Sequence, residues 1–538
     1  PMPRTRLFLI AGAFLLSVCA YSFAVSGVDI ENSKISLAIR YEPPSLNTVK
    51  SSDRVSSFLL THLLEGLTRY GRDNNIVPAA AESWQQRGSS VTFYLRKDAR
   101  WNDGKPVTAH NFVFAWRTLV DPATASKYAF IMEPVKHAAA ITRGERKPDE
   151  LGVQALDDFT LKVELHAPTP YFVGMTAFPA FYPIRKDFYQ QRGARYAADA
   201  KDMLFNGPFE LTEWVHGASL KLRKNPRYWN NENIRIRAID IPYITSDSVA
   251  TLNLFKNNNI AFANDLAKES IADALQSGLP LRKFLDGCTY FYSLNFRAGR
   301  ITRNKALRQA LQSVYDSTLV TNKIIAMPGA QPGLSLFPQF LRGKTRSLRE
   351  EIPPATSGID LARARRLLQQ AKDELQIDQF PPLVLLTSDV PVSVKLAEYV
   401  QYLFKQALSL TIVIDKQTFK QRHVKSYNGE FDIASLSWCP DYDDPLTFAD
   451  YFASWNENNR GKYANPEYDE WVKIAQNNSD TDIRINAFGQ LQRIIADDVV
   501  ILPSYEASVL YVQHPHLKGM QRGIFSGDPS FYFAWLER

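Results

Sequence analysis

Three acidic residues stand close together in one short stretch, with a tryptophan and a cysteine just before them. The stretch, residues 435–452, reads SLSWCPDYDDPLTFADYF and contains Asp441, Asp443 and Asp444. A carboxylate held out of water is stabilised by a cation that also donates hydrogen bonds, and an ammonium group donates three. A site for an ammonium-bearing ligand is therefore the first chemistry that this pattern suggests.

Other uses of the same residues compete with this interpretation. Asp443 and Asp444 precede Pro445, a setting in which acidic residues are usually solvated turn residues. A calcium loop would need the glycine and the terminal glutamate of the EF-hand spacing, and both are missing. Asp441 and Asp443 could be the acid and base of a hydrolase, but neighbours on one loop seldom reach the separation that such pairs need. Trp438 by itself would more often be a core residue than part of a ligand pocket.

No established catalytic or metal-binding motif is present. The chain has no G-x-S-x-G elbow, no G-x-x-x-x-G-K phosphate loop and no H-E-x-x-H zinc motif. Its eight histidines are scattered, and the pair His514 and His516 lacks metal-ligand spacing and is interpreted as part of a surface loop. We therefore expect neither an enzyme, nor a metal site, nor a cofactor.

Strand and helix patterns alternate in the segments that must position these residues. The first half shows strand patterns at 35–39, 91–101, 209–214, 220–223 and 236–244, and helix patterns at 56–67 and, after the N-cap candidate Thr108, at 111–119. The second half shows helix patterns at 305–325, 361–375 (capped by Asp360) and 392–408, and strands at 383–387, 410–414 and 499–512. This alternation predicts a parallel or mixed sheet covered by helices, an α/β lobe at about 285–504.

Length and composition favour a soluble protein of several domains. A chain of 538 residues is too long for one core, and its 45% hydrophobic and 22% charged content is ordinary for a globular protein. The 63 basic and 56 acidic residues are spread along the chain and leave a net charge of +7. No basic cluster with interleaved aromatics stands out, so we expect no nucleic-acid partner.

The N-terminus has the pattern of an export signal. Arg4 and Arg6 precede the apolar run LFLIAGAFLLSVCA at 7–20, which is too short to cross a bilayer comfortably. Residues 22–24, Ser-Phe-Ala, then offer a small-x-small cleavage site. We interpret residues 1–24 as a signal peptide that directs the protein out of the cytoplasm.

The three cysteines divide between the signal and the mature chain. Cys19 would be the lipidated residue of a lipoprotein, a reading that the bulky Val18 before it disfavours. Removing the signal leaves Cys288 and Cys439, which can form one disulfide or stay as two buried thiols. An oxidising compartment lets a disulfide persist, which favours the first alternative.

Several short segments, taken together, carry a family resemblance. They are EPPSLN (42–47), LLEGLTRY (63–70), IVPAAAESW (76–84), FYLRKDARWNDGKPVTAHNFVFAWRTLVDPATAS (93–126), NGPFELTEW (206–214), LRKNPRYW (222–229), CTYFYSLN (288–295) and SWCPDYDDP (437–445). In this order and spacing they resemble the extracytoplasmic solute-binding proteins of peptide-type ABC importers, over essentially the whole mature chain. CTYFYSLN and WCPDY are especially similar to the oligopeptide-binding branch.

The resemblance implies a bilobed α/β protein of the periplasmic-binding-protein fold, with two hinge crossovers and an extra domain inserted in the first lobe. The first lobe would combine residues 33–66, 180–284 and 505–538, with 67–179 as its additional domain. The second lobe would be residues 285–504, and the crossings would lie near 284 and near 505.

The resemblance also implies roles for individual residues. Family members place an aspartate at the Asp441 position, where it pairs with the α-ammonium of a bound peptide. Cysteines at the positions of Cys288 and Cys439 are bridged in the oligopeptide branch, which adds to the case for this disulfide.

An extended peptide needs backbone partners, and two segments are placed to provide them. The chain around Trp438 and Cys439 in one lobe, and around Tyr41 and Glu42 in the other, would pair with the peptide as with an added strand. Such pairing is indifferent to side chains, so broad ligand tolerance follows. The expected pocket walls are Trp438, Phe419, which stands where the branch commonly has an aromatic, and Tyr128.

One position departs from the best-known oligopeptide binders. These have an arginine six residues before the key aspartate that helps to hold the peptide carboxylate, and here that residue is Ser435. The possible substitutes are Lys323, Arg422, His423 and Lys425. The preferred peptide length and the contact of its C-terminus are therefore left open.

Taken together, the sequence predicts a monomeric periplasmic receptor that closes over a short peptide and delivers it to a membrane ABC permease. A binder of another solute on the same fold is the main alternative, for example of a murein peptide, a metal chelate, haem or an opine. An exported hydrolase is the less favoured alternative from a different class.

Overall fold

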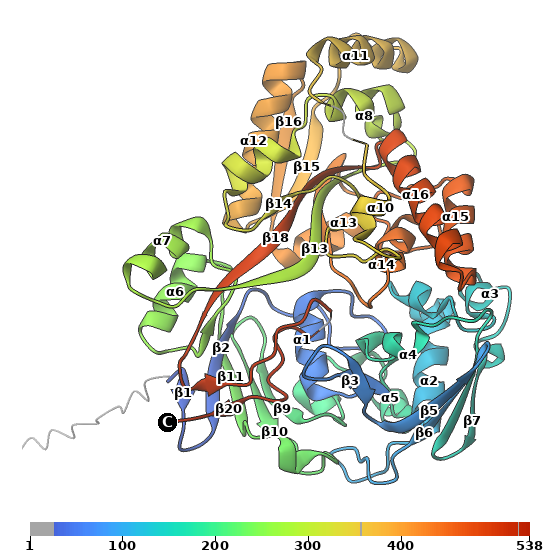
Figure 1. Ribbon diagram of the computed structural model, residues 1–538, viewed down its shortest axis with the longest axis vertical. Coiled ribbons are helices and arrows are strands. Elements are labelled where there is room, and N and C mark those ends of the chain that lie inside the picture. Colours follow the sequence, from blue (N-terminus) through green and yellow to red (C-terminus); the bar gives the residue numbers. More distant parts are fainter. Residues whose placement is uncertain (1–25, 356–357, 526) are drawn as a thin grey trace, which may run out of the picture.

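The computed structural model describes residues 26–355, 358–525 and 527–538 of a molecule with two lobes. The predicted signal peptide at 1–24, with Cys19, lies outside the described residues. We call the lower part in Figure 1, built around a five-stranded and a four-stranded sheet, lobe I. The upper part, built around a seven-stranded sheet, is called lobe II. The bilobed α/β fold is thereby confirmed.

The central sheet of lobe I is mixed. Strands β2 and β11 run parallel, and the other pairs are antiparallel. Ile239 and Ile241 are fully buried, whereas Asp240 between them pairs with Arg223 at 2.7 Å. One face of the strand therefore meets the core, as its alternating pattern predicts. The strand order is β1 (Val28–Asp29), β2 (Lys34–Ile39), β11 (Ala238–Ile244), β10 (Ser219–Lys224) and β9 (Phe209–Val215).

The second sheet of lobe I is antiparallel and lies beside helix α2 (Ala109–Val120). The helix starts after Thr108, as predicted, and the side chain of Asn111 accepts a hydrogen bond from the Thr108 N–H at 2.9 Å. Phe112 and Trp116 are buried on its inner face. This packing fixes the segment that follows α2. The strand order is β5 (Ala81–Arg87), β6 (Ser90–Leu95), β8 (Thr160–Glu164) and β7 (Val153–Asp157).

Shorter elements complete lobe I. Helix α1 (Arg54–Leu63) starts where the Asp53 carboxylate accepts a hydrogen bond from the Ser56 N–H at 2.9 Å. The others are β3 (Thr68–Tyr70), β4 (Ile76–Pro78), α3 (Ala138–Thr142), α4 (Phe172–Met175), α5 (Lys186–Arg192), β19 (Leu517–Lys518) and β20 (Trp535–Leu536). Helices α6 (Ser248–Lys256) and α7 (Lys268–Gln276) form a small cluster at one side of Figure 1.

The sheet of lobe II is mixed and carries helices, as predicted. Strand β15 is parallel to β16 and β17, and β13 is antiparallel to β17 and β18. Helix α12 (Pro391–Leu408) packs on β15 and β16. The strand order is β12 (Phe262–Ala263), β18 (Ile501–Gln513), β13 (Arg282–Leu294), β17 (Ile433–Trp438), β15 (Leu383–Ser388) and β16 (Ile412–Gln417), with β14 (Gln331–Pro332) on β18.

Apart from α14, the remaining helices of lobe II begin at a capping side chain. Asp360 accepts a hydrogen bond from the Arg363 N–H at 2.8 Å and caps α11, as predicted. These helices are α8 (Lys305–Gln312), α10 (Leu348–Glu351), α11 (Leu361–Leu375), α13 (Phe419–Asn428), α14 (Leu446–Ala449), α15 (Pro466–Asn477) and α16 (Thr481–Asp497). Within the described ranges, no helix is long and apolar enough to cross a membrane.

The single helix predicted over 305–325 is wrong. Helix α8 ends at Gln312, and the Asp316 carboxylate accepts hydrogen bonds from the N–H groups of Thr318 and Leu319 at 2.8 and 3.2 Å. Asp316 therefore starts a new segment, α9 (Ser317–Leu319), which continues as the π-helical turn η9 (Val320–Ile325). The apolar residues keep their helical spacing through this break, so the sequence pattern did not reveal it. A capping side chain can start a new helix without changing the hydrophobic pattern.

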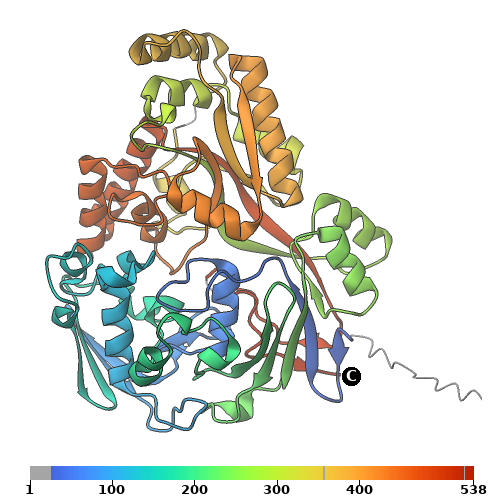
Figure 2. The same ribbon diagram turned by 180° about the vertical axis from the view of Figure 1, so that it is seen from behind.

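Two long strands connect the lobes. β13 and β18 have 13 residues each and pair from Arg282 opposite Tyr511 to Ser293 opposite Ile501. Both run from the lower lobe to the upper one in Figures 1 and 2. The positions near 284 and 505, where the sequence predicts the crossings, fall within these strands, and the exact lobe boundaries stay a prediction.

The connecting strand β13 bends just before a disulfide. Its register to β18 shifts between Leu285 and Thr289, where Gly287 has a φ of 72°, a conformation that favours glycine. The next residue, Cys288, forms the predicted disulfide with Cys439, which follows β17. The disulfide ties a strand that joins the lobes to the acidic stretch of lobe II.

Removing this disulfide should destabilise the protein. The bridged residues are 151 positions apart, so the cross-link restricts a long loop of the unfolded chain. We expect the double variant Cys288→Ser, Cys439→Ser to lose about 2–5 kcal/mol of stability. Guanidinium unfolding checks this: the variant should unfold at lower denaturant than the wild type and be insensitive to reductant. Equal unfolding midpoints for the oxidised wild type and the variant would contradict the expectation.

Candidate ligand-binding site

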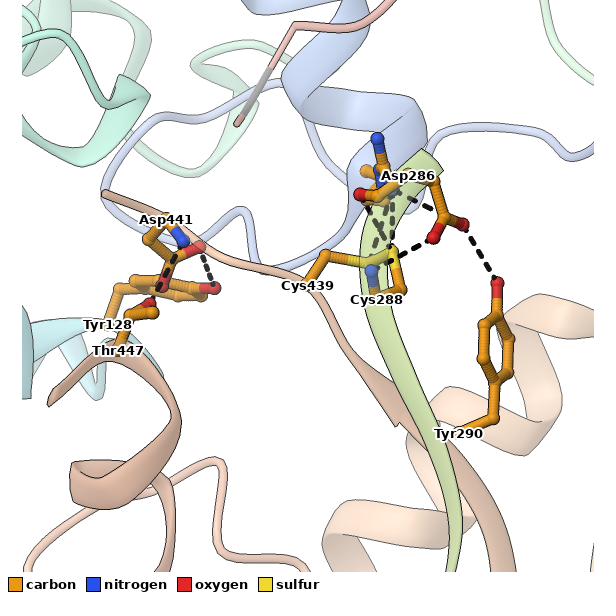
Figure 3. Close-up of a disulfide and its surroundings, with 8 residues drawn as sticks. Tyr128, Asp286, Cys288, Tyr290, Cys439, Asp441 and Thr447 are labelled. Atoms are coloured by element: carbon orange, nitrogen blue, oxygen red, sulfur yellow. Dashed lines mark hydrogen bonds and ion pairs between the residues drawn. A yellow bond between two sulfur atoms is a disulfide. The ribbon is translucent and has the colours of Figure 1, made fainter. Parts of the chain in front are cut away.

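The Asp441 carboxylate lies between the lobes with one oxygen unsatisfied. Its side chain is on the loop after β17, and the residue is 7% exposed. Oδ1 accepts a hydrogen bond from the Tyr128 hydroxyl of lobe I at 3.2 Å (Figure 3). Oδ2 is buried and has no hydrogen-bond partner among the described residues. Burial raises the pKa of the Asp441 carboxyl well above its usual value, and the Tyr128 hydrogen bond opposes this only in part.

The loop that carries Asp441 is fixed from two directions. The Asp441 N–H donates to the Thr447 hydroxyl at 3.0 Å, and the Trp438 indole N–H donates to the Thr447 carbonyl at 2.6 Å. Cys439, between them, is held by the disulfide to β13, as Figure 3 shows. The carboxylate is therefore held in place, and turning it out to water would require breaking these contacts.

Aromatic side chains from both lobes surround this carboxylate. The Tyr128 ring of lobe I stacks on Trp438 of lobe II with centroids 6.0 Å apart and an interplanar angle of 18°. Trp438 has a second aromatic contact with Tyr451, with the ring centroids 4.7 Å apart. The structure thus brings the predicted site residues Tyr128, Trp438, Cys439 and Asp441 together, and we call Tyr128, Trp438 and Tyr451 the aromatic cluster.

Tyr41 and Phe419 meet at a second contact between the lobes. Tyr41 follows β2 in lobe I, Phe419 begins α13 in lobe II, and their rings stack 4.4 Å apart at 13°. The Glu42 side chain points elsewhere. It accepts hydrogen bonds from the Trp214 indole at 2.8 Å and from the Gly217 N–H at 2.9 Å, in the β9–β10 hairpin. Only the Glu42 backbone therefore stays available for the predicted role.

The three clustered acids have three different environments. Asp443 is exposed, as predicted for a turn residue. The same prediction for Asp444 is wrong, because this residue is 8% exposed and pairs with Arg484 through two hydrogen bonds of 2.6 and 2.8 Å. Arg484 comes from α16, forty residues further on, so the sequence pattern around Pro445 did not reveal the pair. Asp441 is the buried acid of the three that has no cationic partner among the described residues.

A fourth acid, Asp450, was missed by the sequence interpretation. It is 3% exposed, and its Oδ1 is buried without a hydrogen-bond partner among the described residues. Burial, and then the nearby charges of Asp441, Glu133 and Asp444, raise the pKa of its carboxyl well above the usual value. Because burial and these neighbouring acids disfavour a further negative charge, the Asp450 carboxyl takes up a proton more readily than usual.

The four residues that the sequence offers for holding a ligand carboxylate lie in different environments. The Arg422 guanidinium donates to the Ser435 carbonyl at 3.0 Å and so lies beside the position that lacks the family arginine. His423 contacts the Ser52 hydroxyl of lobe I at 3.1 Å. Lys425 pairs with Asp415, and Lys323 is exposed. Arg422 is therefore the substitute that the geometry favours.

The disulfide region is a further contact between α1 and the connecting strand. Arg54 of α1 donates to the Cys288 sulfur at 2.7 Å and lies 3.9 Å from the Asp286 carboxylate. Burial raises the pKa of Asp286 to about 6, and the Arg54 charge opposes this shift. The bend of β13 is thereby anchored to lobe I.

Comparisons with known proteins identify relatives over nearly the whole chain. The family profile described as "Bacterial extracellular solute-binding proteins, family 5 Middle" matches residues 75–460. The periplasmic oligopeptide-binding protein OppA of Salmonella typhimurium is 28% identical, over 98% of this chain and 97% of its own. The structure of Listeria monocytogenes OppA bound to peptide is similar with a TM-score of 0.88 at 28% identity, covering 94% of this chain and 99% of that chain.

The lobes are arranged as in the peptide-bound relative. The murein tripeptide-binding protein MppA in its unliganded open form gives a TM-score of 0.61 at 27% identity, covering 95% of this chain and 98% of that chain. Identity and coverage are nearly those of the OppA comparison, so the lower score reflects a different arrangement of similar parts. The contacts of Tyr128 with Asp441 and of Tyr41 with Phe419 thus belong to a closed arrangement.

Breaking the Asp444–Arg484 pair should destabilise lobe II. We expect Arg484→Ala to cost about 3–5 kcal/mol, because it leaves a buried carboxylate without its cation. Chemical unfolding of the ligand-free protein measures this, with Asp443→Asn as the matched control, since that acid is exposed and should change stability little. Equal destabilisation by the two substitutions would refute the assigned environments.

Proposed function

The chain belongs to family 5 of the bacterial extracellular solute-binding proteins, and from this we propose that it is the receptor of an ABC importer for short peptides. It is a binding protein and not an enzyme. The peptide ligands named for OppA of Salmonella typhimurium and of Listeria monocytogenes support the peptide as the ligand class. A periplasmic location, a monomeric state and delivery to a membrane permease are parts of the same proposal.

The observation that carries the proposal is the buried, unpartnered Oδ2 of Asp441. An ionised carboxylate without a partner is costly in a closed cleft, and a peptide brings an α-ammonium with three donors to satisfy it. Tyr128 already donates to Oδ1, so Oδ2 is the atom left for the ligand. Asp441 is thus assigned to the N-terminus of the peptide.

The sheet of lobe II offers an edge for the peptide backbone. Strand β17 pairs with β13 along residues 433–438, but with β15 only at Ile433 and Ala434. Residues 435–438 therefore have no strand partner on the β15 side within the described part of the chain. A peptide can add there as an extended strand, between Trp438 and the Tyr41–Glu42 backbone of lobe I, and such pairing tolerates many side chains.

Removing the Asp441 charge should weaken peptide binding severely. Truncating one partner of a buried charge pair costs about 2–5 kcal/mol, so we expect Asp441→Asn to lower affinity by roughly 30-fold or more. Isothermal titration with a tripeptide measures this, and Asp443→Asn serves as the control with unchanged affinity. N-acetylation of the peptide should produce the same loss in the wild type. Equal binding of acetylated and free peptides would remove the basis of the assignment.

Peptide should also compact the protein. Closure buries Asp441, so it becomes favourable when a ligand brings a cation, and a ligand shifts an equilibrium only by its preference for one state. We expect small-angle scattering to give a smaller radius of gyration with saturating peptide than without it. Asp441→Asn should show a weaker response at the same peptide concentration. An unchanged radius in the wild type at saturation would contradict ligand-driven closure.

A further inference from the structure

The Arg460 guanidinium is buried in lobe II and has no carboxylate partner among the residues that the structure describes. It lies in the polar run NENNRGK at 456–462 and is 7% exposed. Its Nη1 donates to the Ser426 hydroxyl at 2.8 Å, and its Nη2 donates to the Tyr427 hydroxyl at 3.0 Å. The Nε group is buried without a hydrogen-bond partner in the described structure. Neutral hydroxyls orient this cation, but they do not compensate its charge.

Arg422 is a second guanidinium beside it. Apart from its hydrogen bond to the Ser435 carbonyl, its Nε is buried and unsatisfied within the described residues. Burial, followed by the charge of Arg460, lowers the pKa of Arg422 to about 10, so Arg422 stays charged at neutral pH. Burial and the same two cations lower the pKa of His423, which is therefore neutral between them.

No acid of the described chain compensates the pair. Two other arginines of lobe II with little exposure pair with carboxylates, Arg484 with Asp444 and Arg349 with Glu506, whereas the buried Arg308 donates to backbone carbonyls. Glu457, three residues before Arg460, pairs with Lys462 and Lys127 instead. The groups that face the two guanidiniums include Tyr41, Phe419, Tyr427, Tyr451, His423, Ser426 and the Ser435 carbonyl. Because buried charges are normally paired, this arrangement calls for anions from outside the chain.

The arginine pair borders the same aromatic cluster as Asp441. Both guanidiniums act on the pKa of Tyr451, whose ring contacts Trp438. The Arg460 charge also acts on Tyr128, whose hydroxyl binds Asp441. One closed site therefore holds an uncompensated negative group and two uncompensated positive groups.

We propose that Arg422 and Arg460 form an anion subsite that takes two carboxylates at the C-terminal end of the peptide. The first is the terminal carboxylate, and the second is the side chain of a C-terminal aspartate or glutamate. The inference rests on the proposed function, in which the peptide ammonium neutralises Asp441. A peptide with one carboxylate would leave one guanidinium charge uncompensated between the lobes, whereas an acidic last residue balances the site. The receptor is thus selective for the charge of the last residue and tolerant elsewhere.

Matched peptides test the subsite. Isothermal titration of the wild type would use two series of two to five residues, alanines ending either in glutamate or in glutamine. We expect the glutamate peptide of the best-bound length to bind about tenfold or more tightly than its glutamine counterpart, the gain typical of a charge-assisted hydrogen bond. Arg460→Gln and Arg422→Gln should each reduce the ratio of the two affinities, glutamate peptide over glutamine peptide, towards one. Lys405→Gln, an exposed position on α12, should leave the ratio unchanged.

The outcomes separate this inference from the proposed function. Equal affinity of the two series for the wild type overturns the subsite but leaves the peptide receptor in place. Failure of every free-amine peptide to bind overturns the proposed function itself. The wild-type comparison needs no substitution, so it decides the matter even if an arginine variant folds poorly. A ratio that stays high in both arginine variants also overturns the assignment of these residues.

Discussion

The molecule depends on the Asp441 carboxylate, which has no cationic partner in the described part of the chain. Asp441 is enclosed when the lobes meet, and lobe I contributes only the Tyr128 hydroxyl to one of its oxygens. In a site of low dielectric constant, an uncompensated charge costs several kcal/mol. The closed arrangement is therefore incomplete until a cationic group enters. In the proposed function, binding and closure follow from the same interaction, since the ligand provides the cation that the closed protein lacks.

That interaction requires a carboxylate that cannot move away. The Asp441 loop is held by Thr447 and by the Cys288–Cys439 disulfide, and Arg54 anchors the neighbouring bend of β13 to lobe I. A group fixed in this way loses little conformational entropy when the ligand arrives, which favours affinity. The two long strands β13 and β18 connect this fixed region with both lobes. The hinge region and the binding site are therefore parts of one structure.

Charge in the site is distributed between residues that are far apart in the chain. Asp441 lies in one part, and Arg422 and Arg460 make another part positive. The aromatic cluster lies next to both parts, and its rings present apolar surface rather than charge. Under the proposals made above, such a site recognises a ligand by the charges at its two ends, while backbone pairing along β17 is insensitive to the side chains between them.

The sequence by itself determined the local elements and the residues that resemble a known family. The strand alternation around Ile239, the caps Thr108 and Asp360, the disulfide and the place of Asp441 were all predictable, because each depends on neighbours in the chain or on a shared motif. Only the tertiary structure decided which charges are compensated. Asp444 is paired because α16 brings Arg484 to it, whereas Arg460 lies in a polar run that looks solvent-exposed and is buried without an acid. The physical reason is that backbone hydrogen bonds and periodicity act over a few residues, while the electrostatic partner of a buried group comes from wherever the fold places it.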